Sequence, residues 1–333
     1  PTTIEEFYQV LKAFKEKDPD GNGKDDTYGM VIPKWNGLGN GSPFDIMQTW
    51  FGAPNKWGEN EDGELIPDFT TPEYMKALKF FRKLYEEGLI NKDFAVLDPA
   101  KWNDPIVNGK AGVIVDTDSR ARQIDKQIKE AHPDLGSVID VIGTVKGPKG
   151  ERAFPTSGYA GLIAVPKESV KIEEELKDIL EFLDKLNDKE AQILINNGVE
   201  GRNFEIKEGQ FVSLEGEDKT LLYEHEALNQ LGMSIPKFLA YQALEDNDLN
   251  KHLLEIKEKG ENIAVFNPAE PLVSEVYAKK GVQLDNIILD ARVKFISGQI
   301  DEKGFQDAIE LWRKSGGEDY IKEINKLYKE MNK

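Results

Sequence analysis

The sequence contains no cysteine and only three histidines. Without cysteine there is no disulfide, no thiolate metal site and no cysteine nucleophile. His132, His225 and His252 lie far apart, each among charged residues, where a surface histidine is commoner than a catalytic one. No apolar run approaches the length of a membrane span. The usual serine-hydrolase, zinc-protease and phosphate-loop motifs are missing as well.

Positive charge is also scarce, with 43 Lys and Arg against 61 Asp and Glu and a net charge of −18. Such a charge repels phosphate backbones and anionic lipids, so nucleic-acid and membrane-surface roles are disfavoured. Carboxylates are so abundant that the sequence leaves open a pair of catalytic carboxylates like that of a glycosidase. Such a pair is recognised by the distance between its two carboxyl groups in space. A chain of 333 residues is expected to form two domains.

The first helix is predicted in detail. Thr3 and Glu6 have the spacing of a capping box, and an apolar stripe follows at helical period, made of Phe7, Val10, Leu11 and Phe14. Residues 27–32 and 109–115 are predicted strands, and residues 71–87 an amphipathic helix. The second strand is predicted to open into a polar loop over residues 116–120.

Hard oxygen ligands gather around two glycines directly after the first helix. In a calcium loop, alternate side chains and one backbone carbonyl bind the ion. Those positions would be filled by Asp18, Asp20, Asn22, the carbonyl of Lys24, and Asp26. The match to an EF-hand fails at position twelve, where Gly29 replaces a bidentate Glu. We predict one structural Ca²⁺ in an EF-hand-like variant; the alternative is a solvated acidic turn without metal.

Two stretches are interpreted as crossings between domains. Residues 141–145 read as an extended segment before turn residues, and residues 215–219 are polar and turn-prone. Between them, a predicted strand (157–166) and helices (172–186 and 189–196) form a β/α unit. Alternating strands and helices predict an α/β fold, and two crossings predict lobes built from discontinuous segments. The predicted boundaries give segments 1–140, 141–218 and 219–333.

Aromatic residues in polar loops, Trp35 among them, suggest a sugar ligand. Sugar rings stack on aromatic faces, while carboxylates, amides and Arg bind the hydroxyls. Loops at the strand ends of open α/β sheets are where ligands bind. We therefore predict a ligand cleft between the lobes, lined by Trp102, Asp118, Arg120, Tyr159, Phe238 and Tyr241.

Several segments together resemble a known family. They are residues 1–15 with the acidic loop that follows, and the shorter stretches 51–54, 85–89, 108–112, 198–201 and 316–328. These segments are similar to the LplA/LipO-type extracellular solute-binding proteins, the carbohydrate-class subunits of ABC importers, whose relatives include alginate-binding proteins. The resemblance spans essentially the whole chain.

The resemblance implies a two-lobe, periplasmic-binding-protein-like fold that captures an oligosaccharide for membrane permease subunits, without catalysis. It implies Ca²⁺ in the matching loop, although Thr27 stands where the family usually has Glu. It also implies a monomer at the outer surface of a bacterial cell, anchored by a lipid outside this sequence. Two alternatives stay open, a carbohydrate-active enzyme and a calcium-stabilised carbohydrate-binding module.

In that layout residues 1–140 and 219–333 form the C-terminal lobe, and residues 141–218 belong to the N-terminal lobe. Because 141–218 supply too few strands for a covered sheet, we expect the N-terminal lobe to be incomplete in this chain. An exposed sheet edge and an exposed apolar face should then be visible there. We also expect weak ligand affinity.

Overall fold

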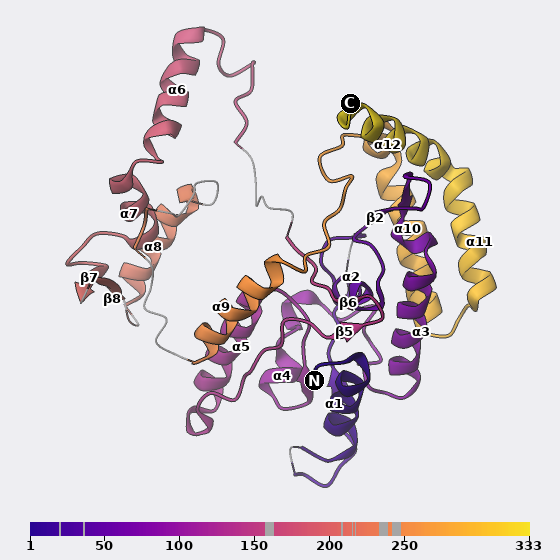
Figure 1. Ribbon diagram of the computed structural model, residues 1–333. Coiled ribbons are helices and arrows are strands. Elements are labelled where there is room, and N and C mark those ends of the chain that lie inside the picture. The colour runs from indigo at the N-terminus through magenta and orange to yellow at the C-terminus, as the bar shows by residue number, and fades with distance from the viewer. Residues whose placement is uncertain are drawn as a thin grey trace. The chain divides into compact units, whose positions relative to one another are not determined.

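The structure is a computed structural model that describes residues 1–19, 21–35, 37–156, 163–207, 209–214, 216, 218–232, 239–241 and 248–333. The chain divides into two compact units. Unit 1 is Pro1–Pro155 with Leu249–Lys333, and unit 2 is Thr156–Asp248 (Figure 1). Each unit is described by itself. None of the helices in the described ranges is both long and apolar enough to cross a membrane.

Unit 1 is built around two short parallel strands, β1 (Tyr28–Met30) and β4 (Ala111–Val113). Met30 lies opposite Val113, and on its other side it forms a parallel bridge with Ile90. The other strands of unit 1 form two antiparallel hairpins. They are β2 (Trp57–Glu59) with β3 (Leu65–Pro67), and β5 (Lys146–Gly147) with β6 (Gly150–Glu151).

Helices make up most of unit 1. They are α1 (Ile4–Glu16), α2 (Pro43–Gln48), α3 (Pro72–Glu86), α4 (Asp104–Val107), α5 (Asp118–Ala131), α9 (Asp248–Glu261), α10 (Glu275–Ile296), α11 (Glu302–Trp312) and α12 (Glu318–Met331). Single turns of tighter helix stand at η1 (Thr49–Phe51), η2 (Asp68–Thr70), η3 (Pro99–Lys101) and η4 (Pro133–Leu135), and a wider turn, η5 (Arg313–Gly317), joins α11 to α12.

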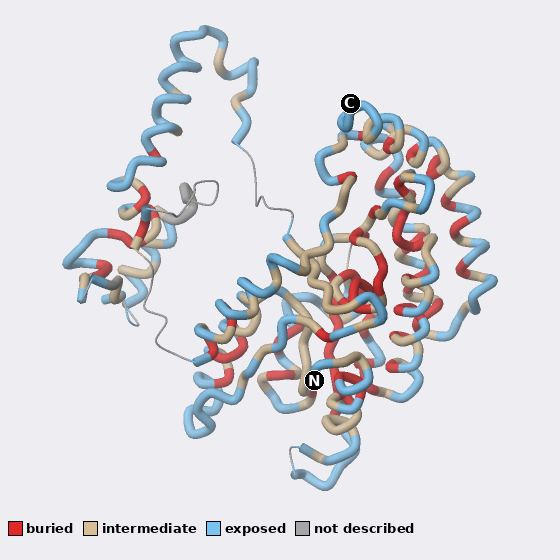
Figure 2. The backbone as a smooth tube through the Cα atoms, viewed as in Figure 1, coloured by how far each residue is buried: buried red, intermediate tan, exposed pale blue. Residues whose placement is uncertain are grey.

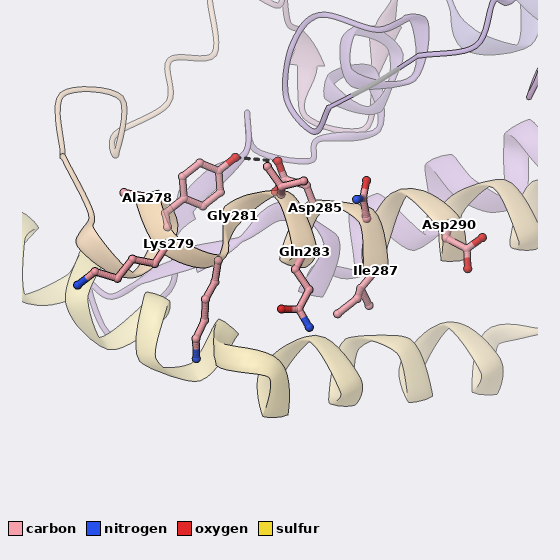
Figure 3. A pocket seen from close by; sticks show the side chains of 11 residues that line it. Ala278, Lys279, Gly281, Gln283, Asp285, Ile287 and Asp290 are labelled. Carbon is pink, nitrogen blue, oxygen red and sulfur yellow. Dashed lines mark hydrogen bonds between the residues drawn. The ribbon is translucent and has the colours of Figure 1, made fainter.

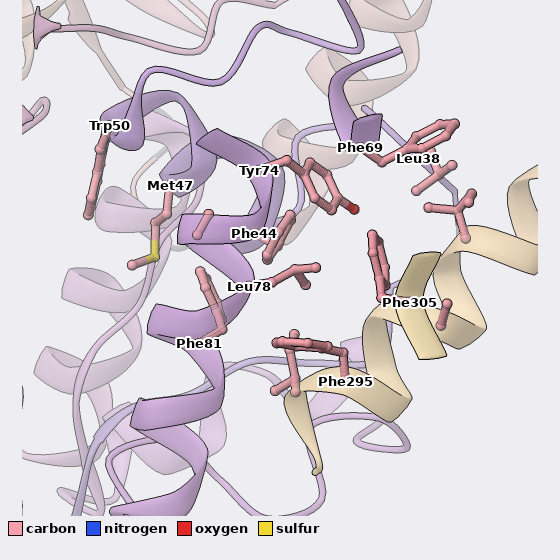
Figure 4. Close-up of a cluster of buried hydrophobic side chains, with 14 of the residues drawn as sticks. Leu38, Phe44, Met47, Trp50, Phe69, Tyr74, Leu78, Phe81, Phe295 and Phe305 are labelled. Atoms are coloured by element: carbon pink, nitrogen blue, oxygen red, sulfur yellow. The ribbon is translucent and has the colours of Figure 1, made fainter. Parts of the chain in front are cut away.

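The core of unit 1 joins the early helices to the late ones. Figure 4 shows Phe44 of α2, Tyr74 of α3 and Phe305 of α11 in one aromatic cluster, with Phe44 and Tyr74 ring centroids 5.0 Å apart. Leu78 is fully buried between them. Phe295 of α10 joins this cluster, with its ring centroid 6.1 Å from that of Phe305, and Figure 2 shows burial along α3 and α10. Since burial of apolar surface is the main stabilising term, this cluster fixes α10 against the N-terminal half of the chain.

Helix ends follow the sequence signals closely. The Thr3 hydroxyl accepts from Glu6 N at 3.1 Å, as predicted for an N-cap. The Glu6 carboxylate in turn accepts from both Thr2 N and the Thr2 hydroxyl, each at 2.7 Å. Phe7 and Leu11 are buried on the predicted face of α1. α3 begins after Thr71 and ends before Gly88, which has φ +69°.

The observed boundaries between the units differ from the predicted ones. They lie at 155/156 and 248/249 instead of 140/141 and 218/219. Residues before 155 stay with unit 1 because Lys146 N donates to Thr2 O (2.8 Å), and Ala153 bridges in parallel to Ala264. Residues 219–232 form a helix, α8 (Lys219–Gly232), which packs on α7 (Lys189–Asn197) in unit 2. The crossing predicted at 215–219 includes residues outside the described ranges, and it stays a prediction.

Unit 2 contains α6 (Glu173–Lys185), α7, α8 and a hairpin of β7 (Phe204–Lys207) with β8 (Gln210–Ser213). No residue of α6 is buried, and Leu176 and Leu180, which share one face of the helix, are 37% and 52% exposed. The expected exposed apolar face is thus confirmed on this helix (Figure 2). Of the strand predicted at 157–166, residues 157–162 lie outside the described residues, and 163–166 form no strand.

Candidate functional site

The candidate site of unit 1 lies at the carboxyl ends of its parallel strands. Parallel strands end at the same edge of a sheet, which is the edge where open α/β folds bind ligands. Trp35 follows β1, Phe94 follows Ile90, and Asp116 follows β4. Asn91 fixes the first two segments to each other, because its Oδ1 accepts from Ile32 N (2.7 Å) and its Nδ2 donates to Ile32 O (2.9 Å).

Arg120 and Trp102 pack together at this edge. The Arg120 guanidinium lies over the Trp102 ring, 4.4 Å from its centroid. Nε of Arg120 donates to Asp116 Oδ2 (2.7 Å), and a terminal nitrogen donates to Asn103 Oδ1 (2.9 Å). A guanidinium held by two acceptors against an aromatic face has little freedom to move. The Arg120 side chain is therefore positioned before any ligand arrives.

The Trp102 side chain is held in place by burial and by a hydrogen bond. Its exposed fraction is 1%, and its indole Nε1 donates to Val31 O (3.0 Å). Trp35 meets the Trp102 ring edge-on, with centroids 5.8 Å apart and planes at 76°. Edge-to-face packing of this kind is favourable, and it supports Trp35 from one side.

Trp35 also lines a pocket of about 370 Å³, here called the Trp35 pocket. Its apolar wall comes from Ile32, Phe44, Phe81, Phe94, Leu289, Val293 and Ile296. Its polar groups come from Lys34, Ser42, Asn286, Asp290 and Arg292. An aromatic-lined concavity with a few placed polar groups is the usual form of a small-molecule site.

A buried charge network underlies this pocket. Arg292 is 5% exposed and donates to Asp45 Oδ1 at 2.9 Å, so its charge is neutralised within the protein. Asp68 lies close by, also buried, and accepts from Gln48 Nε2 (2.8 Å). Burial raises the pKa of Asp68 to about 7. Arg292 therefore lines the Trp35 pocket with its charge already neutralised by Asp45.

The structure brings together only some of the predicted ligand residues. Trp102 and Arg120 are in direct contact, although Trp102 is enclosed by the core cluster of Val31, Ile106 and Ile124. Asp118 and Arg120 were placed in a polar loop by sequence, but α5 begins at Asp118, so both lie in the first helical turn. That prediction is wrong because Thr117 already has the extended conformation of an N-cap residue.

Asp118 forms ion pairs instead of standing free. Its carboxylate lies 2.9 Å from the Arg122 guanidinium and 2.8 Å from Lys257 Nζ. Partial burial acts to raise the pKa of Asp118, but the hydrogen bond from Lys257 and the two positive charges hold it below its ordinary value. A ligand hydroxyl at this carboxylate would therefore meet an ionised acceptor.

The remaining predicted ligand residues belong to unit 2. Tyr241 N donates to Asn197 Oδ1 (3.0 Å), and its ring packs against Phe204 with centroids 5.8 Å apart. Tyr159 and Phe238 lie outside the described residues. Their roles in ligand binding stay predictions.

Sequence reasoning missed the late half of the Trp35 pocket. Asn286, Asp290 and Arg292 come from α10, about 250 residues after Trp35. Nothing in the local sequence of α10 marks them, since polar residues on an amphipathic helix usually face solvent. Only the long-range packing of α10 on α3, and the hydrogen bond from Arg292 to Asp45 of α2, bring them to the pocket.

The acidic loop after α1 is closed by hydrogen bonds. The Asp18 carboxylate accepts from Asn22 N (3.1 Å) and Gly23 N (2.8 Å), and Asn22 Nδ2 donates to Asp26 Oδ1 (3.2 Å). Asp18 has φ +47°, the left-handed conformation that Asp tolerates in tight turns. Lys110 Nζ also reaches Asp26 Oδ2, at 2.8 Å. The side chains predicted to bind Ca²⁺ thus converge around one loop.

Two further observations bear on this loop. Asp20 lies outside the described residues, and in the part of the chain that is described no three acidic or histidine side chains form a group that could hold a metal ion. The Thr27 hydroxyl donates to Phe14 O (2.8 Å), which ties the end of the loop to α1. The fit of the loop to Ca²⁺ therefore depends on Asp20 joining Asp18, Asn22 and Asp26.

Comparison with known proteins agrees with this architecture. The sequence matches the family of bacterial extracellular solute-binding proteins over residues 1–193. It is 66% identical to Lipoprotein LipO of Bacillus subtilis over 328 residues, which is 98% of this chain and 65% of LipO. The chain belongs to the bacterial extracellular solute-binding protein family.

This solute-binding protein also resembles a relative named for its ligands. It is 33% identical to the polygalacturonan/rhamnogalacturonan-binding protein YtcQ of Bacillus subtilis, over 99% of this chain and 64% of YtcQ. The chain thus spans about two thirds of the length of both curated relatives.

Structure comparison confirms the predicted fold class. The substrate-binding protein FusA of S. pneumoniae in complex with kestose superposes with a TM-score of 0.70 at 21% identity. The alignment covers all of this chain and 69% of FusA. At that identity the likeness shows a shared solute-binding-protein fold.

Proposed function

We propose that this solute-binding protein captures an oligosaccharide outside the bacterial cell, as the substrate-binding component of an ABC importer, and that it performs no catalysis. The observation that carries the proposal is the Trp35 pocket, an aromatic-lined concavity at the carboxyl ends of parallel strands. The name of YtcQ supports a carbohydrate, since that relative is named for binding pectic polymers.

The chemistry of the pocket suits a sugar ring. Trp35 is half-buried and packs edge-to-face against Trp102, which holds its ring in place. The other face of the Trp35 ring can then stack on the C–H groups of a sugar ring. Ser42, Asn286 and Asp290 offer hydroxyl, amide and carboxylate groups to the ligand's hydroxyls. Because Arg292 is already paired with Asp45, the pocket does not need an anionic ligand to neutralise the Arg292 charge.

An enzyme is the competing function, and the described histidines give it little support. His252 pairs with Asp140 at 3.0 Å on the surface, and His132 Nε2 contacts the Val107 carbonyl at 3.2 Å. None of the three histidines, His225 of α8 included, lines the Trp35 pocket. A carbohydrate-active enzyme would convert its ligand, whereas a receptor would release it unchanged.

A glycan screen separates the two functions. The protein is mixed with oligogalacturonides, fructo-oligosaccharides and other plant and bacterial oligosaccharides, and melting temperature and reaction products are both recorded. We expect a rise in melting temperature with at least one glycan and no product. Trp35→Ala should abolish that rise, while Leu311→Ala, an exposed position on α11 outside the pocket, should leave it unchanged. A cleaved glycan would refute the receptor function.

We further propose that the acidic loop holds one structural Ca²⁺, bound by Asp18, Asp20, Asn22, the Lys24 carbonyl and Asp26. Support comes from the convergence of the described side chains and from hard oxygen donors, which Ca²⁺ prefers. When bound, the ion would supply positive charge that offsets the clustered carboxylates. It would thereby pin the loop between α1 and β1.

Chelation tests the calcium proposal. A metal that binds only the folded state stabilises it, so chelator should lower the melting temperature of the calcium-loaded protein. Asp20→Ala should remove that response. The matched control is Asp25→Ala, which removes a carboxylate of the same loop that pairs with Lys15 and is absent from the predicted ligand set. Equal chelator responses in both variants would count against the site.

The location and partners of the protein follow from the same proposal. We propose an extracytoplasmic, lipid-anchored monomer that delivers its ligand to membrane permease subunits, and the name Lipoprotein LipO supports the anchor. We also propose that unit 1 belongs to the C-terminal lobe of the receptor and unit 2 to its N-terminal lobe.

A further inference from the structure

A second concavity runs along α10 in unit 1, here called the α10 groove. Its volume is about 900 Å³, and its lining residues within the described ranges lie between Tyr277 and Asp290. Figure 3 shows Lys279, Gln283 and Asp290 spread along the length of this helix. Its lining combines polar and charged side chains with apolar surface; the polar ones are Lys279, Lys280, Gln283, Asp285, Asn286 and Asp290, and the apolar surface comes from Tyr277, Val282 and Ile287.

The α10 groove and the Trp35 pocket share two wall residues. Asn286 and Asp290 line both. A molecule that fills the Trp35 pocket and continues past these residues would therefore enter the α10 groove without leaving the protein surface.

Hydrogen-bonding side chains follow the groove at helical spacing. Positions 279, 283, 286 and 290 are separated by four, three and four residues, so they form one row on one face of α10. At 1.5 Å per residue the row is about 16 Å long. The Gln283 and Asn286 amides are exposed and make no hydrogen bond to another described residue. Each amide offers both a donor and an acceptor, which matches a row of hydroxyls.

The far end of the groove is rigid. The Tyr277 hydroxyl donates to Asp285 Oδ2 (2.7 Å), as Figure 3 shows, and the Tyr277 ring stacks on Tyr320 at 5.0 Å. Gly281 makes room for that ring, since a Cβ there would lie 2.9 Å from Tyr277 Cε2. Lys56 lies over the ring in a γ-turn with φ +61°, closed by a hydrogen bond from Trp57 N to Asn55 O (2.6 Å). A preformed wall lowers the ordering cost of binding.

From these observations we infer that the ligand site extends from the Trp35 pocket along α10, so that it takes a linear oligosaccharide of several rings, with Gln283 and Asn286 binding the rings beyond the pocket. This inference rests on the proposed function. It adds the length of the ligand and two specificity-determining residues.

Size series of oligogalacturonides and of fructo-oligosaccharides, from the dimer upward, test the inference by titration calorimetry. We expect affinity to rise with length and then level off. Gln283→Ala and Asn286→Ala should each weaken the longest bound oligomer by about 3- to 10-fold, the cost of one hydrogen bond, and the dimer by less than about twofold. Gln306→Ala, an exposed glutamine on α11 outside the groove, is the matched control and should change neither.

Two outcomes separate this inference from the proposed function. If dimers bind as tightly as longer oligomers, or if both variants weaken short and long ligands equally, the extension along α10 is wrong and the receptor function stands. If no member of either series binds, the inference is overturned, and the proposed function with it for both sugar classes.

Discussion

Asp68→Asn tests the buried charge network beneath the Trp35 pocket. Burial raises the pKa of Asp68 from 3.8 to about 7, so the folded protein binds this proton more tightly than the unfolded chain does. The stabilising contribution of the bound proton is fully present below about pH 4 and is lost as the pH rises through 7. At ~1.36 kcal/mol per pKa unit, the predicted loss between pH 4 and pH 8 is about 4 kcal/mol.

Asp68→Asn should remove this pH dependence. The new amide can donate to Gln48 Oε1, which is buried without a hydrogen-bond partner among the described residues. Like the protonated carboxyl group, it carries no charge. We therefore expect the variant to lose less free energy of unfolding than the wild type between pH 4 and pH 8.

Urea unfolding of both proteins at the two pH values measures the effect. Asp62→Asn, which removes an exposed carboxylate from the β2–β3 turn, should follow the wild type. If Asp68→Asn and the wild type lose the same free energy of unfolding over this range, the Asp68 carboxyl group does not titrate near pH 7 and the reasoning fails.

Three further changes probe the packing. Trp102→Ala should lower the free energy of unfolding by about 3–5 kcal/mol in urea titrations, whereas the half-buried Trp35→Ala should cost clearly less. Arg292→Met should cost about 3–5 kcal/mol in thermal unfolding, because Asp45 is left buried and unpaired, and adding Asp45→Asn should recover part of the loss. Leu180→Ser on α6 should change stability by less than about 0.5 kcal/mol, since that face has no buried residue, and a larger loss would show that the face is covered.

Local signals in the sequence predicted local structure well. The cap at Thr3, the apolar face of α1 and the span of α3 follow from patterns within about 15 residues, where one helix decides its own ends. The helix α5 was not predicted, because Asp118, Ser119 and Arg120 suit a polar loop as well as a first helical turn.

The candidate site was predicted only in part, for a physical reason. Trp35 and Arg120 stand next to strand ends, and strand ends can be recognised in sequence. Asn286 and Arg292 enter the site only because the Phe44, Tyr74 and Phe305 cluster fixes the late helices on the early ones. Contacts between residues more than 100 positions apart leave no periodic trace in one sequence. The same limit applied to the unit boundaries, which depend on the pairing of Ala153 with Ala264.

Binding of oligogalacturonides and fructo-oligosaccharides to the wild type and to Trp35→Ala, measured by titration calorimetry at millimolar ligand concentrations, tests the central claim most directly. We predict saturable binding of at least one oligosaccharide, recovered intact afterwards, and a loss of at least about tenfold in affinity in Trp35→Ala, since truncating a central aromatic contact costs upwards of ~1.4 kcal/mol. Binding that is unchanged in Trp35→Ala, with the variant folded, would contradict the claim that the Trp35 pocket is the ligand site.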